Sequence, residues 1–237
     1  MKLYHVLGFR SSKVVWLYKE LRLLYPSTTA LPPLNVHTLE AESFRREKPA
    51  WFLKINPNGK VPVLEDDSSS EAAPIFMWDS IAICFYLLEK FDTKGLLAPK
   101  SDVFRSQMYQ WGLYSSGTLD ELTAKSSPYQ MMYSFPRSSE QEPNFTPNIN
   151  SEHELKCQKA FMEVCGPILE RELGKHSHDF FFGPSFTALD IFIAYPLGFI
   201  NLKGWLHKDK FPRLYEYFLS IKERPMYRAC FKPVDSI

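Results

Sequence analysis

The residues best suited to chemistry lie in the stretch 54–66, which reads KINPNGKVPVLED. Asn56-Pro57 and Asn58-Gly59 are turn dipeptides, so the chain is expected to reverse there. Residues 61–64 then read as a short apolar strand. Because proline cannot donate to a sheet ladder, Pro62 must stand at the edge or the entrance of this strand.

The Val61–Pro62 bond is a candidate for the cis isomer, which X-Pro bonds reach at a cost of about 0.5–1 kcal/mol. A cis bond would turn the amide and carbonyl of Val61 outward, and a peptide-like ligand could pair with them as an added strand. The alternative is a hairpin corner that binds nothing. The elements around the turn favour the first interpretation.

The segments on either side of this turn predict a small α/β layer. Strands are expected at residues 3–7, 34–39, 61–64 and 75–77, with helices through 14–21, 43–53 and 80–91, the second of them irregular. The order βαβαββα is typical of a mixed sheet with a parallel βαβ half and a hairpin half. Ser11 or Ser12 is the expected cap of the first helix.

Beyond residue 92 the strand signals fade and helical patterns follow, at 104–125, 152–174 and 211–221. Thr187 and Asp190 have capping-box spacing at the start of a further helix. The segment 126–150 is rich in Ser, Pro, Asn and Tyr, and a loop of that length is often functional. The sequence therefore predicts an all-helical second part.

Composition excludes several classes of function. The chain has 237 residues, 45% hydrophobic and 23% charged, with a net charge of +1 and no basic stripe, so neither nucleic acid nor a membrane surface is an expected partner. The N-terminus lacks the features of a signal peptide, which predicts a cytoplasmic protein. The four cysteines show no metal spacing, so we expect reduced structural thiols and no metal.

These motifs together resemble those of the cytosolic glutathione transferases. Residues 56–62 resemble the loop and cis-proline strand that bind the glutathione backbone, and 78–83 are similar to the acidic-Ser step that opens the third helix. Residues 186–190 resemble the capping box of the helical domain, and 10–17 the first helix of fungal and bacterial serine-type members. The resemblance implies a thioredoxin-like domain at 1–92, a linker at 93–101 and a helical-bundle domain at 102–237.

The resemblance also implies how glutathione, as cosubstrate, would be held. The backbone of Val61, before Pro62, would exchange hydrogen bonds with the cysteinyl unit, and Lys60 would pair with the glycyl carboxylate. Asp79 would hold the glutamyl ammonium, while Ser80 and the start of its helix would hold the γ-glutamyl carboxylate. The alternatives are that Asp79 and Ser80 are only helix caps and that Lys60 is only an exposed turn residue.

Three residues are candidates for activating the glutathione thiol. Many serine-type relatives place the catalytic serine near Phe9, which has no hydroxyl. We therefore predict Ser11 as the donor, with Ser12 as the second choice, because both lie at the start of a helix whose positive end favours a thiolate. Tyr4, a phenol near the end of the first strand, is the third.

The function implied is conjugation of glutathione to hydrophobic electrophiles, a detoxification reaction, with glutathione peroxidase activity as a side reaction and a homodimer as the assembly. An electrophile site between the domains would be lined by Tyr109, Trp111, Tyr114 and the segment 129–135. One alternative is a glutathione-binding or ligand-carrying protein with little or no catalysis. Another is an interaction module of a larger assembly.

Overall fold

A mixed sheet organises the first part of the chain. The computed structural model describes residues 1–26, 31–68, 73–125 and 152–231. Within them the strands are β1 (Lys2–His5), β2 (Asn35–Thr38), β3 (Val63–Asp66) and β4 (Ile75–Trp78), in the spatial order β2-β1-β3-β4. β1 runs parallel to β2, whereas β3 runs antiparallel to β1 and to β4. The predicted combination of a parallel βαβ half and a hairpin half is confirmed.

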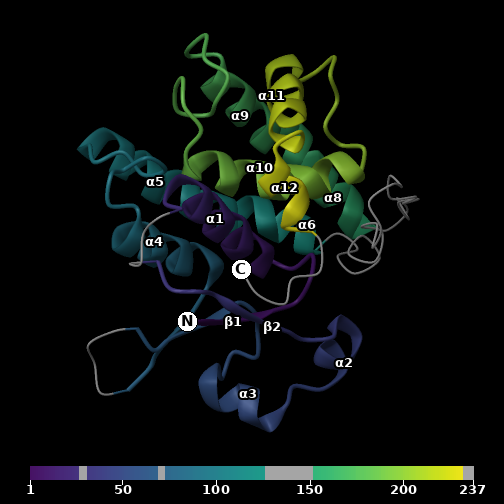
Figure 1. Cartoon of the computed structure of the whole chain (residues 1–237). Coiled ribbons are helices and arrows are strands. Elements are labelled where there is room, and N and C mark those ends of the chain that lie inside the picture. Colours follow the sequence, from purple (N-terminus) through teal and green to yellow (C-terminus); the bar gives the residue numbers. More distant parts are fainter. Residues whose placement is uncertain (27–30, 69–72, 126–151, 232–237) are drawn as a thin grey trace. The chain divides into compact units, whose positions relative to one another are not determined.

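Helices cover both faces of this sheet (Figure 1). α1 (Ser11–Leu24) and α4 (Ser80–Phe91) pack together on one face, and α2 (Ala41–Arg46) and α3 (Ala50–Ile55) lie on the other. Side chains alternate along β1, so its successive residues serve different cores. Leu3 is fully buried, whereas Tyr4 packs with Phe52 in the cluster beneath α2 and α3.

The structure corrects one element of this part. Residues 43–53, expected as one irregular helix, are divided between α2 and α3. Pro49 stands at the N-cap of α3 with an extended ψ of 135°. A proline has no N–H to continue a helix, so the chain must restart there. β3 begins at Val63, which leaves Pro62 at the entrance of the strand, as predicted.

The described residues divide into two compact units, one of Met1–Lys94 with the residues from Ala229, the other of Gly95–Arg228. The predicted boundaries at 92, 93–101 and 102 remain a prediction. The second unit contains the following helices and π-helical turns: α5 (Asp102–Tyr114), η1 (Ser115–Leu119), α6 (Asp120–Lys125), α8 (Glu152–Ala160), η2 (Phe161–Cys165), α9 (Gly166–Leu173), α10 (Ala188–Leu202), α11 (Pro212–Lys222) and α12 (Pro225–Ala229). The predicted segment 126–150 lies outside the described residues.

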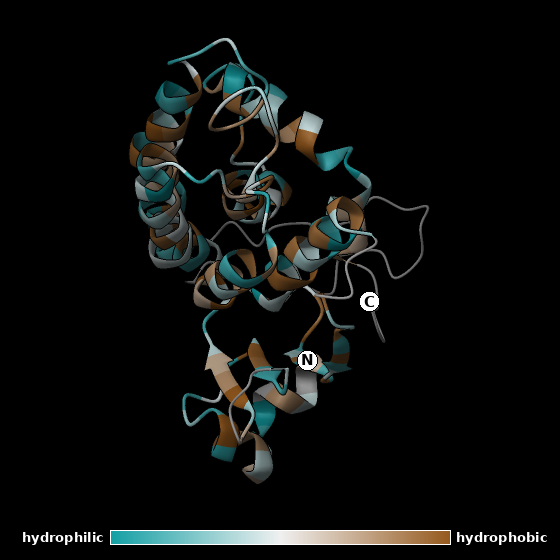
Figure 2. Cartoon of the chain, turned by 60° about the vertical axis from the view of Figure 1, so that its left-hand side comes forward, coloured by the Kyte–Doolittle hydropathy of each residue, from teal (hydrophilic) through white to brown (hydrophobic). Residues whose placement is uncertain are grey.

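α10 is the central helix of the second unit's core. All of its residues from Ala188 to Ile200 are buried, as expected of a helix that is apolar on every side. The predicted capping box is present: the Asp190 carboxylate accepts from the Thr187 N–H at 2.7 Å and also from the Phe181 N–H at 2.8 Å. Most other helices carry hydrophilic and hydrophobic residues together (Figure 2).

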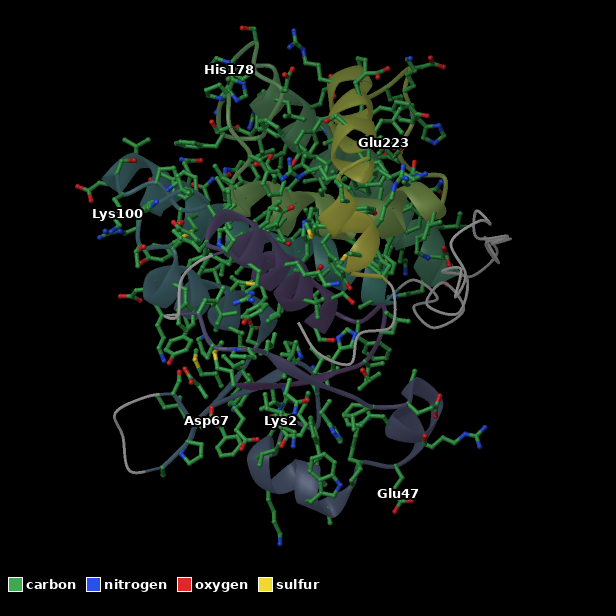
Figure 3. The ribbon with its side chains drawn as sticks, in the orientation of Figure 1. Lys2, Glu47, Asp67, Lys100, His178 and Glu223 are labelled. Carbon is green, nitrogen blue, oxygen red and sulfur yellow. The ribbon has the colours of Figure 1, made fainter. Side chains whose placement is uncertain are left out.

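Charged side chains of both signs project from the two units. Glu47, Lys100 and Glu223 project outward from the ribbon (Figure 3). No helix among the described residues combines the length and the apolar character needed to cross a membrane. The four cysteines are buried and free of disulfides, in agreement with the prediction of structural thiols.

Candidate functional site

Three predicted site segments meet at one end of the sheet. In the described register Tyr4 lies opposite Val63, and Val63 lies opposite Trp78. Val61, Val6 and Ser80 each lie two residues beyond these paired positions, at the same end of the sheet. The end of β1, the entrance of β3 and the start of α4 are therefore neighbours, although they are far apart in sequence.

The turn before β3 is built around Asn56. This residue is 1% exposed, and its Nδ2 donates to the Lys60 carbonyl at 2.7 Å while its Oδ1 accepts from the Asn58 N–H at 3.0 Å. Gly59 completes the turn with φ of 63°, a conformation that favours glycine. The dipeptide Asn56-Pro57 predicts a turn, but nothing in the sequence alone shows that the Asn56 side chain closes it.

The turn presents Val61 as predicted. The Val61–Pro62 peptide bond is cis, which confirms that expectation. Among the described residues nothing hydrogen-bonds to the backbone N–H or carbonyl of Val61. The Lys60 side chain is exposed. Lys48, which sequence analysis missed, lies against Gly59, 3.4 Å from where a Cβ of that residue would stand.

Asp79 caps α4 from an unusual backbone conformation. Its Oδ1 accepts from the N–H groups of Ile81 at 2.9 Å and Ala82 at 3.2 Å. Its φ of 81° is rare for a residue with a Cβ. Such conformations cost about 1–3 kcal/mol and cluster at ligand sites. The Asp79 side chain is exposed, so capping leaves its second oxygen open to a ligand.

Ser80 follows in the first turn of α4. It is 2% exposed, and its hydroxyl has no hydrogen-bond partner in the described structure. Its N–H is also unpaired there, because the helix ladder and Asp79 engage only the later amides. A buried hydroxyl without a partner costs about 1–3 kcal/mol. Two donors at a helix N-terminus are therefore unpaired in the described structure, and such a position favours anions.

At the start of α1 the structure corrects the expected cap. The N-cap position is Arg10, and neither Ser11 nor Ser12 caps the helix. Ser11 is fully buried. Its Oγ lies 2.8 Å from His5 Nδ1, accepts from the Val6 N–H at 3.2 Å and donates to the Val6 carbonyl at 3.1 Å. Burial lowers the pKa of His5 from 6.5 to about 4, so the ring is neutral at physiological pH.

The other two catalytic candidates differ from Ser11. Ser12 is also fully buried, but its hydroxyl has no partner among the described residues. Tyr4 lies in the cluster with Phe52, and its hydroxyl donates to Glu65 Oε2 at 2.9 Å. Burial is the main cause of its raised pKa. Tyr4 and His5 alternate on β1, so the structure does not bring Tyr4 together with Ser11.

Two of the aromatic residues expected to line an electrophile site, Trp111 and Tyr114, pack edge-to-face with ring centroids 5.4 Å apart. Trp111 is 4% exposed and packs edge-to-face on Phe181, with ring centroids 4.9 Å apart, so it belongs to the core. Tyr109 is 49% exposed, and Tyr114 is half-buried. The segment 129–135 lies outside the described residues. No group of three or more His, Cys, Asp or Glu residues is arranged to hold a metal in the described part of the chain.

Solved structures share this fold. A glutathione transferase family member from Pseudomonas fluorescens with two glutathione bound has a TM-score of 0.71 at 19% identity, covering 100% of this chain and 92% of that chain. A glutathione transferase from Phanerochaete chrysosporium with oxidized glutathione has a TM-score of 0.70 at 20% identity, covering 97% and 92%. The predicted thioredoxin-like first part and helical second part are confirmed.

Sequence comparisons agree with the fold. The family described as "Glutathione S-transferase, N-terminal domain" matches residues 10–90. Glutathione S-transferase A of Pleuronectes platessa is 27% identical over 204 residues, 84% of this chain and 81% of the relative. Glutathione S-transferase 3 of Schizosaccharomyces pombe is 21% identical over 243 residues, 98% of this chain and 87% of the relative. The chain is thus similar to glutathione S-transferases along most of its length, and its residues 10–90 match their N-terminal domain.

Proposed function

We propose that this protein binds glutathione and transfers its sulfur to hydrophobic electrophiles. The observation that carries the proposal is the pair of unsatisfied groups at one end of the sheet. The backbone of Val61 and the N–H and hydroxyl of Ser80 lie two residues beyond the Val63–Trp78 pair, and all lack partners in the described structure. A short peptide with an anionic end would satisfy both.

Each part of glutathione has a matching group. The cysteinyl unit pairs with the backbone of Val61, which the turn at Pro62 presents. The γ-glutamyl carboxylate accepts from Ser80, and the glutamyl ammonium pairs with the free oxygen of Asp79. Lys60 is an exposed cation beside Val61 and suits the glycyl carboxylate. Opposite charges at both ends of the tripeptide give orientation as well as affinity.

Of the three catalytic candidates, Ser12 is the one with a proton to give. The Ser11 proton is engaged by Val6 and the Tyr4 proton by Glu65, whereas the Ser12 hydroxyl is unpaired in the described structure. A free thiol has a pKa of about 8.5, and lowering it by one unit needs about 1.4 kcal/mol. A hydrogen bond to an anion is worth about 1.5–3 kcal/mol, which lowers the pKa of the thiol by about one to two units, toward neutral pH.

The same thiolate would act as a peroxidase in a side reaction. Attack on a peroxide oxygen gives glutathione sulfenic acid and an alcohol, and a second glutathione then converts the sulfenic acid to the disulfide with loss of water. The alternative function is a carrier that binds glutathione without efficient chemistry. Its support is that Phe9 offers no donor and that the Ser11 hydroxyl is already engaged.

Ser80→Ala tests the proposed binding site with two independent measurements. The affinity for glutathione, measured by calorimetry, should fall about ten-fold or more, because a hydrogen bond to a carboxylate is lost. The melting temperature of the free protein should not fall, because that hydroxyl has no partner to lose. The matched control is Ser106→Ala, on the exposed side of α5, where affinity should stay unchanged.

Retention of the parent on immobilised glutathione and turnover of an activated aryl halide complete the test. Ser12→Ala should retain binding and lose most of the turnover. Binding without any turnover in the parent would favour the carrier. A parent that does not bind glutathione would refute the proposal.

We also propose a cytoplasmic homodimer that acts in detoxification. β4 is an edge strand that exposes two large aromatic residues, Phe76 at 41% and Trp78 at 51%. Open strand edges and exposed apolar side chains both favour association with a second chain. Light scattering of the parent should give twice the monomer mass, and Phe76→Ser with Trp78→Ser should shift it toward the monomer.

A further inference from the structure

The hydroxyl of Ser11 closes the turn between β1 and α1. It makes three contacts, with His5 Nδ1 at 2.8 Å, the Val6 N–H at 3.2 Å and the Val6 carbonyl at 3.1 Å. All three lie five or six residues back in the chain, at the end of β1. Both side chains are fully buried, so water does not compete for these bonds.

Counting protons assigns the histidine tautomer. Ser11 has one proton, and if it goes to the Val6 carbonyl, His5 Nδ1 must be the N–H that donates to Ser11 Oγ. In the other tautomer the Ser11 hydroxyl would donate to Nδ1 in place of the Val6 carbonyl. The ring proton would then lie on the buried Nε2, which has no partner in the described structure. A buried N–H without a partner is rarer than a buried acceptor without one. The Nδ1–H form therefore satisfies more groups.

The segment held in this way borders the proposed glutathione site. Val6 belongs to the same buried cluster as Val61. The Val6 carbonyl also accepts from the Phe9 N–H at 3.1 Å, and the Phe9 carbonyl accepts from the Ser12 N–H at 2.8 Å. A chain of hydrogen bonds thus runs from His5 to the first turn of α1.

We propose that His5 is a positioning residue for sulfur transfer, which acts by locking Ser11 onto Val6 and so fixes the first turn of α1, where Ser12 lies. The inference rests on the proposed function. Ser11 is then part of the support and not the group that donates to the sulfur. His5 touches neither substrate, and its imidazole contributes through the placement of the turn. A misplacement of about 1 Å in such a site lowers the rate about 100-fold.

His5→Leu and His5→Asn separate positioning from simple packing. Leucine cannot donate to Ser11 Oγ, whereas asparagine carries an amide N–H that can stand where Nδ1–H stands. With glutathione and an activated aryl halide, His5→Leu should lower kcat about ten- to hundred-fold and leave the KM for glutathione within about two-fold, because Val61 and Ser80 still bind it. His5→Asn should restore most of kcat. His153→Leu, at an exposed position of α8, is the control and should match the parent.

The double variant His5→Leu with Ser11→Ala tests whether the two residues act together. Because one removes the donor and the other the acceptor of the same bond, the double variant should be no slower than the worse single variant. Losses that multiply would overturn the proposal. So would loss of kcat in Ser11→Ala with full activity in His5→Leu, since Ser11 would then act on the sulfur itself.

The ultraviolet absorbance of bound thiolate gives a readout that packing alone does not move. His5→Leu should bind glutathione with a smaller thiolate fraction at neutral pH than the parent. Should His5→Leu fail to fold, nitrogen NMR of the parent decides: the Nδ1–H tautomer supports the inference and the Nε2–H tautomer overturns it. A parent that does not bind glutathione overturns the proposed function and the inference with it. If the parent is active and His5→Leu is equally active, the inference about His5 is overturned but the proposed function stands.

Discussion

The buried imidazole of His5 makes the stability of the first unit depend on pH. Burial lowers the pKa of His5 from 6.5 to about 4 in the folded protein, whereas the unfolded chain keeps the ordinary value. As the pH falls, the unfolded state therefore binds the proton first. The stability that His5 contributes is complete above pH 6.5, and it is lost as the pH falls toward 4.

The size of this loss follows from the two pKa values. A fall from 6.5 to about 4 spans about 2.5 pH units at about 1.36 kcal/mol each, so about 3 kcal/mol is at stake in all. About 2 kcal/mol of it is lost between pH 7.5 and pH 5. Asp190 acts in the opposite direction, because burial raises its pKa to about 6. Its folded form gains a proton over the same interval, which adds about 1 kcal/mol of stability.

The variant His5→Asn separates the pH-dependent stability due to His5 from that of the other titrating groups. Asparagine does not titrate, so subtracting the variant from the parent removes the contributions of Asp190 and of the remaining side chains. Urea unfolding of both proteins at pH 7.5 and pH 5 should show the advantage of the parent shrinking by about 2 kcal/mol at the lower pH. An advantage that stays constant across this interval would show that His5 is not a neutral buried base, and the reasoning would fail.

Two further predictions concern the second unit. In Gly166→Ala the new Cβ would stand 2.5 Å from the Phe211 ring, so overpacking should lower the free energy of unfolding by about 1–3 kcal/mol; Gly117→Ala, with nothing within 4 Å, should be neutral or stabilising. Lys203 Nζ and Glu154 Oε1 form a buried pair at 2.8 Å, so Glu154→Gln should cost about 3–5 kcal/mol. Replacing both residues, Glu154 by Leu and Lys203 by Met, should cost less than Glu154→Gln alone. If urea unfolding gives Glu154→Gln the same free energy of unfolding as the parent, the ion pair contributes nothing to stability.

The sequence predicted those features that neighbouring residues determine. The turn at residues 56–60 and the cis bond at Val61 follow from local dihedral preferences and from the tertiary amide of proline. The capping box of Thr187 and Asp190 follows from a spacing of three residues. The division of the helix at Pro49 was equally local, and the proline alone was sufficient signal to predict it.

Features that depend on contacts across the fold were beyond sequence reasoning. The hydroxyl of Ser11 was expected to cap α1 or to meet a ligand, and it bonds back to Val6 and His5 because the turn after β1 directs it there. Trp111 packs on both Phe181 and Tyr114, and its contact with Phe181, seventy residues later in the chain, was not predicted. The only signal for His5 in the sequence was its place in an apolar strand, which predicts a buried histidine that needs a hydrogen-bond partner.

The three serines that begin helices, Ser11, Ser12 and Ser80, differ in whether their hydroxyl proton already has an acceptor within the protein. The Ser11 hydroxyl donates to the Val6 carbonyl, so Ser11→Ala should lower the stability of the protein without ligand. Ser12 and Ser80 are buried with unpaired hydroxyls in the described structure, a state that favours the folded chain only if a ligand completes it. Loss of either should therefore weaken catalysis or binding more than folding. The rise in melting temperature on adding glutathione compares the three serines directly. A hydroxyl that binds the ligand contributes to this rise and not to the melting temperature of the free protein.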